Sequence, residues 1–196
     1  MVAKGLFLAK RGRPDIAPTI AYLCTRVKGQ TAEDWVKLRR MMLFLNGTKD
    51  NCLNLSSDRS GKIIWYIDAA FAVHPDFKSH TGANMTMGKG AILSSSTKQK
   101  MNTRSSTEAE IVSSDDMLSQ VLWARLFLEG QGYEVKENVI MRDNQSTMKL
   151  EMNGKSSAGR RTRHLNIRFF YITDQIEKKQ VTIEYCPTDQ MWADYM

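Results

Sequence analysis

Lys62–Asp68, KIIWYID, is the segment from which the architecture of the chain can be inferred. Its β-branched and aromatic residues predict a strand, and a carboxylate ends it. Two short strands are expected at 83–87 and 91–95, with Gly88-Lys89-Gly90 as the hairpin turn between them. The region that starts at Lys62 therefore begins with three strands in succession.

The segments that follow alternate between helix and strand. Residues 106–128 show the strongest helical pattern of the chain. Further helices are predicted at 145–152 and 162–178, and further strands at 138–142 and 180–186. The order β-β-β-α-β-α-α-β, followed by the start of one more helix, is typical of an α/β domain.

Residues 1–57 have a different pattern and are predicted to be mostly helical. Within them, the spacing of Thr31 and Asp34 is close to that of a capping box at a helix start. Residues 54–61, NLSSDRSG, are polar and rich in turn-forming residues, which makes them the best candidate for a boundary. We therefore expect a helical segment at 1–57 and a second domain at 58–196.

The composition favours a globular, basic protein of a reducing, intracellular compartment. The 196 residues are 42% hydrophobic and 25% charged, so the chain can bury a core. Twenty-eight Lys and Arg against 21 Asp and Glu give a net charge of +7, which suits either a polyanionic ligand or simple solubility. No apolar run approaches the roughly 20 residues of a membrane span, and no signal peptide is recognisable. Three distant cysteines without a Cys-x-x-Cys pair predict neither a disulfide framework nor a zinc site.

Several acids are placed where they can do chemistry. Asp68 and Asp143 end predicted strands, and α/β folds place ligands at such ends, although a cap of the next turn explains each acid alone at least as well. On the long helix, Glu110 shares the apolar face, whereas Glu108 lies on a polar, solvated face and has capping-box spacing to Ser105. Glu110 is therefore expected to point inward, where a carboxylate requires a cation or a donor.

A fourth acid, Asp194, follows Met191-Trp192-Ala193 at the start of the last predicted helix. Four converging acids would form an oxygen-ligand site suited to Mg²⁺ or Mn²⁺. Two such ions, about 4 Å apart, activate a water and stabilise the leaving oxygen of a phosphodiester. Only two residues follow Asp194, so we expect the last helix to be truncated to about one turn and Asp194 to be the acid held least firmly.

Six motifs follow one another along the chain: YIDAAFA at 66–72, SSSTKQ at 94–99, SSTEAE at 105–110, DNQS at 143–146, RTRHLNIR at 161–168 and QMWAD at 190–194. Together, and in this order, they resemble the ribonuclease H domain of copia-type LTR retrotransposon polyproteins. The likeness extends over about 62–196. The segment before it resembles the C-terminal tail, or connection, of the reverse transcriptase that precedes this domain, and it contains no Tyr-x-Asp-Asp polymerase motif.

The resemblance implies a ribonuclease H-like fold, with a five-stranded mixed sheet flanked by helices on both faces. It implies a ribonuclease H that hydrolyses the RNA strand of RNA–DNA hybrids by two-metal-ion catalysis during reverse transcription, with two Mg²⁺ ions that Mn²⁺ can replace. The implied catalytic and metal-binding set is Asp68, Glu110, Asp143 and Asp194. The upstream reverse transcriptase of the same polyprotein is the implied partner, and the implied location is cytoplasmic, in virus-like particles, or nuclear, with no membrane association.

A hybrid nuclease must recognise the 2′-OH across a shallow minor groove and hold phosphates without sequence preference. The candidate nucleic-acid-binding residues are Lys98, Arg104, Asn144, Gln145, Arg161, Arg163, His164 and Arg168. A solvated surface is the alternative explanation of the basic clusters. Related nucleases use a His in the loop before the last helix; that loop has none here, and His164 is a candidate substitute. His74 and His80 are interpreted as loop residues, and Trp65, Trp123 and Trp192 as core.

Two other functions remain compatible with the sequence. A catalytically decayed module of the same fold would bind hybrid or scaffold the polymerase without cutting. An integrase or transposase core is a second possibility, but such nucleases have a different spacing of acids and lack the SSTEAE motif. The four intact acids favour the active nuclease.

Overall fold

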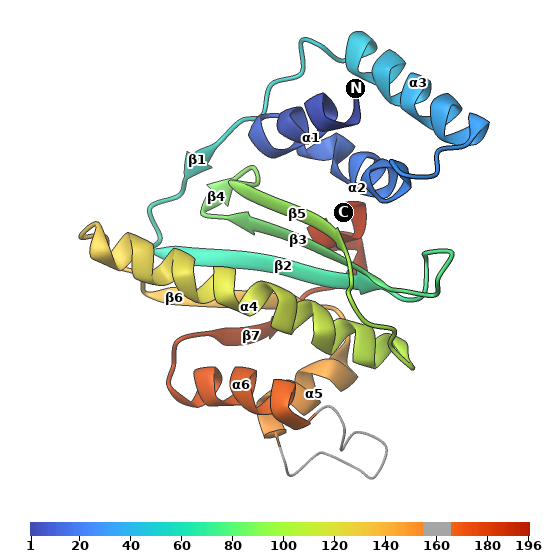
Figure 1. The fold of residues 1–196 in the computed structure, drawn as a ribbon. Helices are drawn as coiled ribbons and strands as arrows, with labels where there is room; N and C mark the ends of the chain where they lie inside the picture. The colour runs from blue at the N-terminus through green and yellow to red at the C-terminus, as the bar shows by residue number, and fades with distance from the viewer. Residues whose placement is uncertain (155–165) are drawn as a thin grey trace.

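The computed structural model describes residues 1–154 and 166–196, and it contains a five-stranded mixed sheet (Figure 1). The strand order is β5-β3-β2-β6-β7. The strands are β2 (Lys62–Ala70), β3 (His80–Thr86), β5 (Leu93–Lys98), β6 (Glu137–Arg142) and β7 (Thr182–Tyr185). β2 pairs antiparallel with β3 and parallel with β6, so the mixed sheet expected from the sequence is confirmed.

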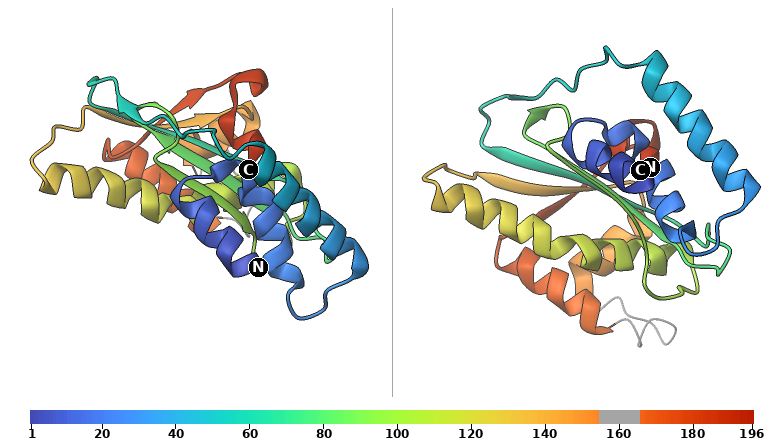
Figure 2. Two further views of the ribbon diagram at one scale, coloured as in Figure 1. Left: turned by 90° about the horizontal axis from the view of Figure 1, so that it is seen from above. Right: turned by 45° about the horizontal axis from the view of Figure 1, so that its top comes forward.

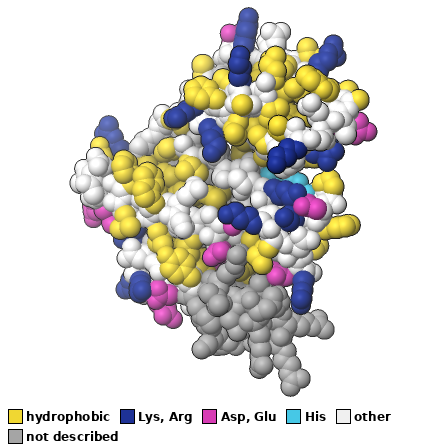
Figure 3. Space-filling model, viewed as in Figure 1, with side chains coloured by type: hydrophobic (Ala, Val, Ile, Leu, Met, Phe, Trp, Pro, Cys, Tyr) yellow, Lys and Arg dark blue, Asp and Glu magenta, His cyan; other side chains and the backbone are white. Residues whose placement is uncertain are grey.

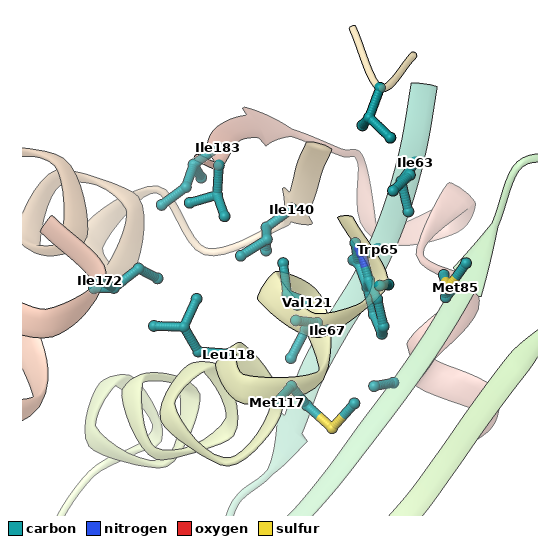
Figure 4. Close-up of a cluster of buried hydrophobic side chains, with 14 residues drawn as sticks. Ile63, Trp65, Ile67, Met85, Met117, Leu118, Val121, Ile140, Ile172 and Ile183 are labelled. Atoms are coloured by element: carbon teal, nitrogen blue, oxygen red, sulfur yellow. The ribbon is translucent and has the colours of Figure 1, made fainter. Parts of the chain in front are cut away.

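β2 occupies the centre of the sheet because alternate residues along it are apolar and buried. Ile63, Trp65 and Ile67 are each at most 1% exposed and point toward the same face. They pack with residues of α4 (Ser106–Gly130), such as Met117 and Val121, in the main hydrophobic core (Figure 4). The core therefore lies between the sheet and this long helix.

The sheet is covered on both faces. α4, α5 (Gln145–Asn153) and α6 (Asn166–Glu177) lie on one side, and the N-terminal helices and the C-terminal end lie on the other (Figures 1 and 2). The C-terminal end comprises the short turns η4 (Thr188–Gln190) and η5 (Trp192–Tyr195). This arrangement is the predicted α/β architecture.

The N-terminal segment forms three helices with a small core of their own. They are α1 (Val2–Arg11), α2 (Ala17–Arg26) and α3 (Ala32–Gly47), with the turn η1 (Pro14–Ile16) between the first two. The capping box at Thr31 and Asp34 is present at the start of α3. A Cβ on Gly5 would lie 2.3 Å from the Ile20 side chain, so this glycine lets α1 and α2 approach closely. Among the described helices, none combines the length and apolar character needed to cross a bilayer.

Several boundaries differ from the sequence predictions. β3 begins at His80, inside the expected loop, because cross-strand pairing to β2 continues as far as Ala70. The turn between β3 and β5 contains β4 (Gly88–Lys89), which pairs with β1 (Ser56–Ser57) in a separate two-stranded ribbon. The predicted helix at 162–178 is described from Asn166 onward, and its first four residues lie outside the described part.

Candidate active site

Three carboxylates meet at one edge of the sheet. Asp68, Glu110 and Asp143 each offer an oxygen, and these oxygens all lie within 4.8 Å of one another. Asp68 lies near the end of β2 and Asp143 directly follows β6; the two strands are parallel neighbours, so their ends lie side by side. Glu110 enters from the beginning of α4. This edge is where the sequence predicts a ligand site.

Asp194 reaches the same edge from η5. Burial, and then the neighbouring carboxylates of Asp68 and Asp143, raise the pKa of Asp194 to about 6. Electrostatic interaction with two members of the cluster places this acid beside it. The structure thus brings together all four acids that the sequence singled out.

The segment that carries Asp194 is hydrogen-bonded to the sheet, and the expectation that Asp194 is the acid held least firmly stays a prediction. Asn84 Nδ2 donates to the Trp192 carbonyl at 2.9 Å, and Ser96 Oγ donates to the Met196 carbonyl at 2.7 Å. The Trp192 ring also stacks on Tyr66 with 4.9 Å between centroids. Residues of three strands therefore contact the segment that carries Asp194.

Glu110 is the most perturbed acid of the cluster. Burial raises the pKa of Glu110 to about 9; the Arg142 guanidinium opposes this rise, and Asp68 and Asp143 add to it. Arg142 Nη1 lies 3.0 Å from Glu110 Oε2. Several carboxylates crowded at a partly buried edge lose much of their mutual repulsion when a cation binds between them. A set of hard oxygen donors fits Mg²⁺ or Mn²⁺.

Glu108 takes the capping role predicted for it. Its backbone N–H donates to Ser105 Oγ at 3.1 Å, and its Oε2 accepts from the Arg104 backbone N–H at 2.7 Å. Glu108 is nevertheless buried rather than solvated, with 5% of its surface exposed. Glu108 and Glu110 are therefore equally buried, and only their hydrogen-bond and charge partners distinguish the capping acid from the acid of the cluster.

The described candidates for nucleic-acid contact have varied surroundings. Lys98 Nζ pairs with Asp76 at 2.7 Å, whereas the Arg104 side chain is exposed. Asn144 Oδ1 accepts from the Ser146 and Thr147 backbone N–H groups, and so caps α5. Gln145 is exposed. Lys and Arg side chains gather beside a histidine on the right of Figure 3, so this face offers positive charge to a polyanion.

The remaining candidates cannot be placed at side-chain level. Arg161, Arg163 and His164 lie outside the described residues. Arg168 belongs to α6, but its side chain is likewise outside the description. Their roles in binding, and that of His164 in place of a loop histidine, stay predictions.

Two histidines interpreted as loop residues line a cavity beside the acids. The cavity has a volume of about 350 Å³, and its wall includes Asp68 and Asp194. His74 Nε2 lies 3.0 Å from His80 Nδ1, and His80 Nε2 lies 2.8 Å from Ser96 Oγ. Burial lowers the pKa of His80 to about 4, which leaves the ring neutral at neutral pH. The sequence offers no signal for this placement, because it depends on the cross-strand register of β2 and β3.

The tryptophans divide between core and surface. Trp65 is fully buried and donates its ring N–H to Asn138 Oδ1 at 3.1 Å, as a core residue should. Trp123 is 60% exposed and stacks on Phe127, so its interpretation as core is wrong. The reason is its place on α4, on the side opposite to the stripe that packs on the sheet. Trp192 is 37% exposed and stacks on Tyr66, so its interpretation as core is also wrong.

The sequence was compared with protein families and with known proteins. No family model matches the sequence. The retrovirus-related Pol polyprotein from transposon TNT 1-94 of Nicotiana tabacum is 30% identical over 186 residues, which are 94% of this chain and 14% of that polyprotein. The chain therefore spans about one seventh of the length of this relative.

Two solved structures share the fold at 17% identity. A ribonuclease H1 isolated from compost by a metagenomic approach has a TM-score of 0.51, with 68% of this chain and 91% of that chain covered. The foamy viral protease–reverse transcriptase, solved in complex with double-stranded DNA, has a TM-score of 0.50 and covers 94% of this chain and 37% of its own.

Fold and site together define a ribonuclease H-like domain with an acidic edge. The sequence comparison adds that the homologues of this chain are retrovirus-related Pol polyproteins of plant copia-type transposons, which the chain matches over part of their length.

Proposed function

We propose that this domain is a metal-dependent endonuclease that hydrolyses the RNA strand of RNA–DNA hybrids during retrotransposon reverse transcription. The observation that carries the proposal is the convergence of Asp68, Glu110 and Asp143 within 4.8 Å, with Asp194 beside them. An edge so rich in carboxylates is suited to hold divalent cations rather than to bind a polyanion directly. The relationship to Pol polyproteins supports the same reaction class.

The residues of the chain have separable roles in this proposal. Asp68, Glu110 and Asp143 supply oxygen ligands from three rigid elements, and Asp194 supplies a fourth from η5. Divalent ions, when bound here, would lower the pKa of an attacking water and stabilise the leaving oxygen. Because the acids project from strand ends and a helix start, little rearrangement is needed to form the site.

The proposed substrate is a hybrid duplex bound through its phosphates. The net charge of +7 supports binding of a polyanion. Arg104, in the segment before Glu110, and Gln145, two residues after Asp143, are both exposed. Both can therefore contact a bound duplex. Contacts with the 2′-OH would distinguish the RNA strand, and phosphate contacts would hold the duplex without sequence preference.

The proposed partner is the reverse transcriptase of the same polyprotein. The three N-terminal helices expose large apolar side chains, among them Phe7, Trp35 and Phe44. In Figure 3 these helices form the upper part of the molecule, where hydrophobic surface is extensive. Such a surface suits contact with another domain of the polyprotein.

The test is incubation of the chain with end-labelled RNA–DNA hybrid and Mg²⁺. We expect fragments of the RNA strand only, no cleavage of a DNA duplex, and no cleavage when a chelator is present. Asp143→Asn serves as the inactive control. If hybrid is bound in a mobility-shift assay but never cut at any Mg²⁺ or Mn²⁺ concentration, the decayed binding module replaces the nuclease.

A further inference from the structure

The side chain of Arg142 is fully buried, and it contacts each of the three elements that carry the acid cluster. Its Nη1 donates to the Ile67 carbonyl at 2.7 Å, directly before Asp68. Nη1 also donates to Glu110 Oε2 at 3.0 Å, and Nη2 donates to the Glu110 carbonyl at 3.1 Å. Arg142 itself directly precedes Asp143. One guanidinium, on the residue before Asp143, thus links Glu110 to the backbone directly before Asp68.

Glu151, on α5, holds the other side of the guanidinium. Arg142 Nη2 lies 3.2 Å from Glu151 Oε1, which also accepts a hydrogen bond from Ser114 Oγ. Both side chains of this pair are completely buried. The Glu151 backbone is fixed in turn, because Thr173 Oγ1 donates to its carbonyl at 2.8 Å. The planar fork of arginine is therefore oriented from both ends.

A buried arginine between two acids is difficult to explain by stability alone. Burying an ion pair removes both charges from water, and neutral side chains of similar size often support the fold equally well. The donor geometry offers a better explanation, because the contacts converge on Glu110 and on the residue before Asp68. Interactions of this kind orient the ligands of metal sites in proteins.

We propose that Arg142 is a positioning residue: it holds Glu110 against Asp68 and Asp143, while Glu151 orients the guanidinium and balances its charge. The inference rests on the proposed metal site and adds to it a residue that the acid motifs do not include. Arg142 remains bound to Oε2 of Glu110, which leaves the other carboxylate oxygen for a cation.

Charge and position make opposite predictions for the loss of Arg142. Removing a cation next to the acids should tighten divalent-ion binding by Coulomb attraction. Removing the group that orients Glu110 should weaken it, by about tenfold or more if the effect resembles other residues that orient metal ligands. The single variant Arg142→Gln, however, leaves two buried acids without a cation and is expected to be unstable.

The sharp test is the double variant R142Q/E151Q, which removes one charge of each sign and keeps amide donors and acceptors. Its matched control is R125Q/E129Q on the same helix α4 as Glu110, which removes a partly exposed Arg–Glu pair with a separation of 2.9 Å. Mn²⁺ affinity is measured by calorimetry without nucleic acid, and folding by thermal melting. We expect about tenfold weaker Mn²⁺ binding for R142Q/E151Q and wild-type affinity for R125Q/E129Q.

A folded R142Q/E151Q that binds Mn²⁺ within twofold of wild type would overturn the inference. If wild type itself binds no Mn²⁺, the proposed function fails instead, so the two failures are distinguishable. Should the double variant not fold, a crystal structure of the wild-type chain with Mn²⁺ decides the question. Positioning requires that Arg142 Nη1 stay within about 3.2 Å of Glu110 Oε2 when the metal is bound; separation of the two would refute it.

Discussion

Two acids at the beginning of α4 differ in the region that they contact: Glu108 contacts the preceding loop, and Glu110 contacts the acidic edge of the sheet. Glu108 and Glu110 are both 5% exposed and only two residues apart. Glu108 accepts a backbone N–H of the preceding loop, which is a structural role. Glu110 faces two carboxylates and one buried guanidinium, an arrangement that could hold a metal ion. The comparison shows that partners, rather than depth of burial, separate a structural acid from a functional one.

The largest expected difference between the two acids is in catalysis. Glu110→Gln removes one anionic ligand of the proposed metal site, so we expect RNA-strand cleavage to fall by at least about 1,000-fold, or about 4 kcal/mol. Glu108→Gln keeps an acceptor for the Arg104 N–H and should retain most activity. Single-turnover rates on a labelled hybrid at saturating Mg²⁺ measure both. Swapped effects would mean that the assignment of the two acids is wrong.

The second difference concerns pH and stability without metal. The folded-state pKa of Glu110, about 9, lies above its unfolded value, so the folded state binds more protons between about pH 4.5 and 9. The free energy of unfolding should therefore fall as pH rises through this window, by up to about 1.4 kcal/mol per unit from this group. Urea titrations at several pH values with chelator present measure the slope.

Glu110→Gln should flatten this slope, and Glu108→Gln should leave it unchanged. Saturating Mn²⁺ should also reverse part of the loss at pH 8, because a bound cation stabilises the ionised form. An equal slope in all three proteins would assign the pH dependence to other groups.

A smaller effect is expected where the sheet holds the fourth acid. Ser96→Ala removes the hydrogen bond to the Met196 carbonyl and the contact with His80, a loss of about 1 kcal/mol. Because the segment of Asp194 is then held less firmly, we expect cleavage to slow severalfold and the Mg²⁺ requirement to increase. Ser95→Ala, on the other face of β5, is the control. An unchanged Mg²⁺ dependence would show that other contacts suffice to hold Asp194.

The smallest effect on cleavage is expected from Ser105, the residue that caps the beginning of α4. Ser105→Ala removes the acceptor of the Glu108 N–H, so we expect the free energy of unfolding to fall by about 1 kcal/mol. Cleavage should change by less than threefold, because Glu110 lies further along the helix and keeps its Arg142 contacts. Chemical denaturation and the hybrid assay together test this. A large loss of activity would mean that the cap also positions the site.

Much of the fold follows from local sequence patterns. The alternating apolar residues of β2, the long helical pattern of α4 and the face on which Glu110 lies are all encoded within a few turns or strand residues. The same local information places Asp68 near the end of β2, which continues to Ala70, and Asp143 directly after β6. For these elements the predictions and the structure agree.

The rest depends on contacts between segments far apart in the chain. The role of Arg142 requires β2, α4 and α5 to be in place around it, and nothing in the run of residues before Asp143 marks it. His80 approaches the acids only through the pairing of β3 with β2. The segment that carries Asp194 likewise contacts Asn84 and Ser96, which the local helical pattern around Asp194 does not reveal.

Catalysis as proposed requires that Asp68, Glu110 and Asp143 form a binding site for divalent cations. The most direct measurement is an anomalous difference map from crystals of the chain soaked in Mn²⁺. We expect density within bonding distance, about 2.0–2.4 Å, of oxygens from these three residues. We also expect this density to be absent in Glu110→Gln. Density elsewhere on the surface, or none at this edge at saturating Mn²⁺, would contradict the proposed cation site.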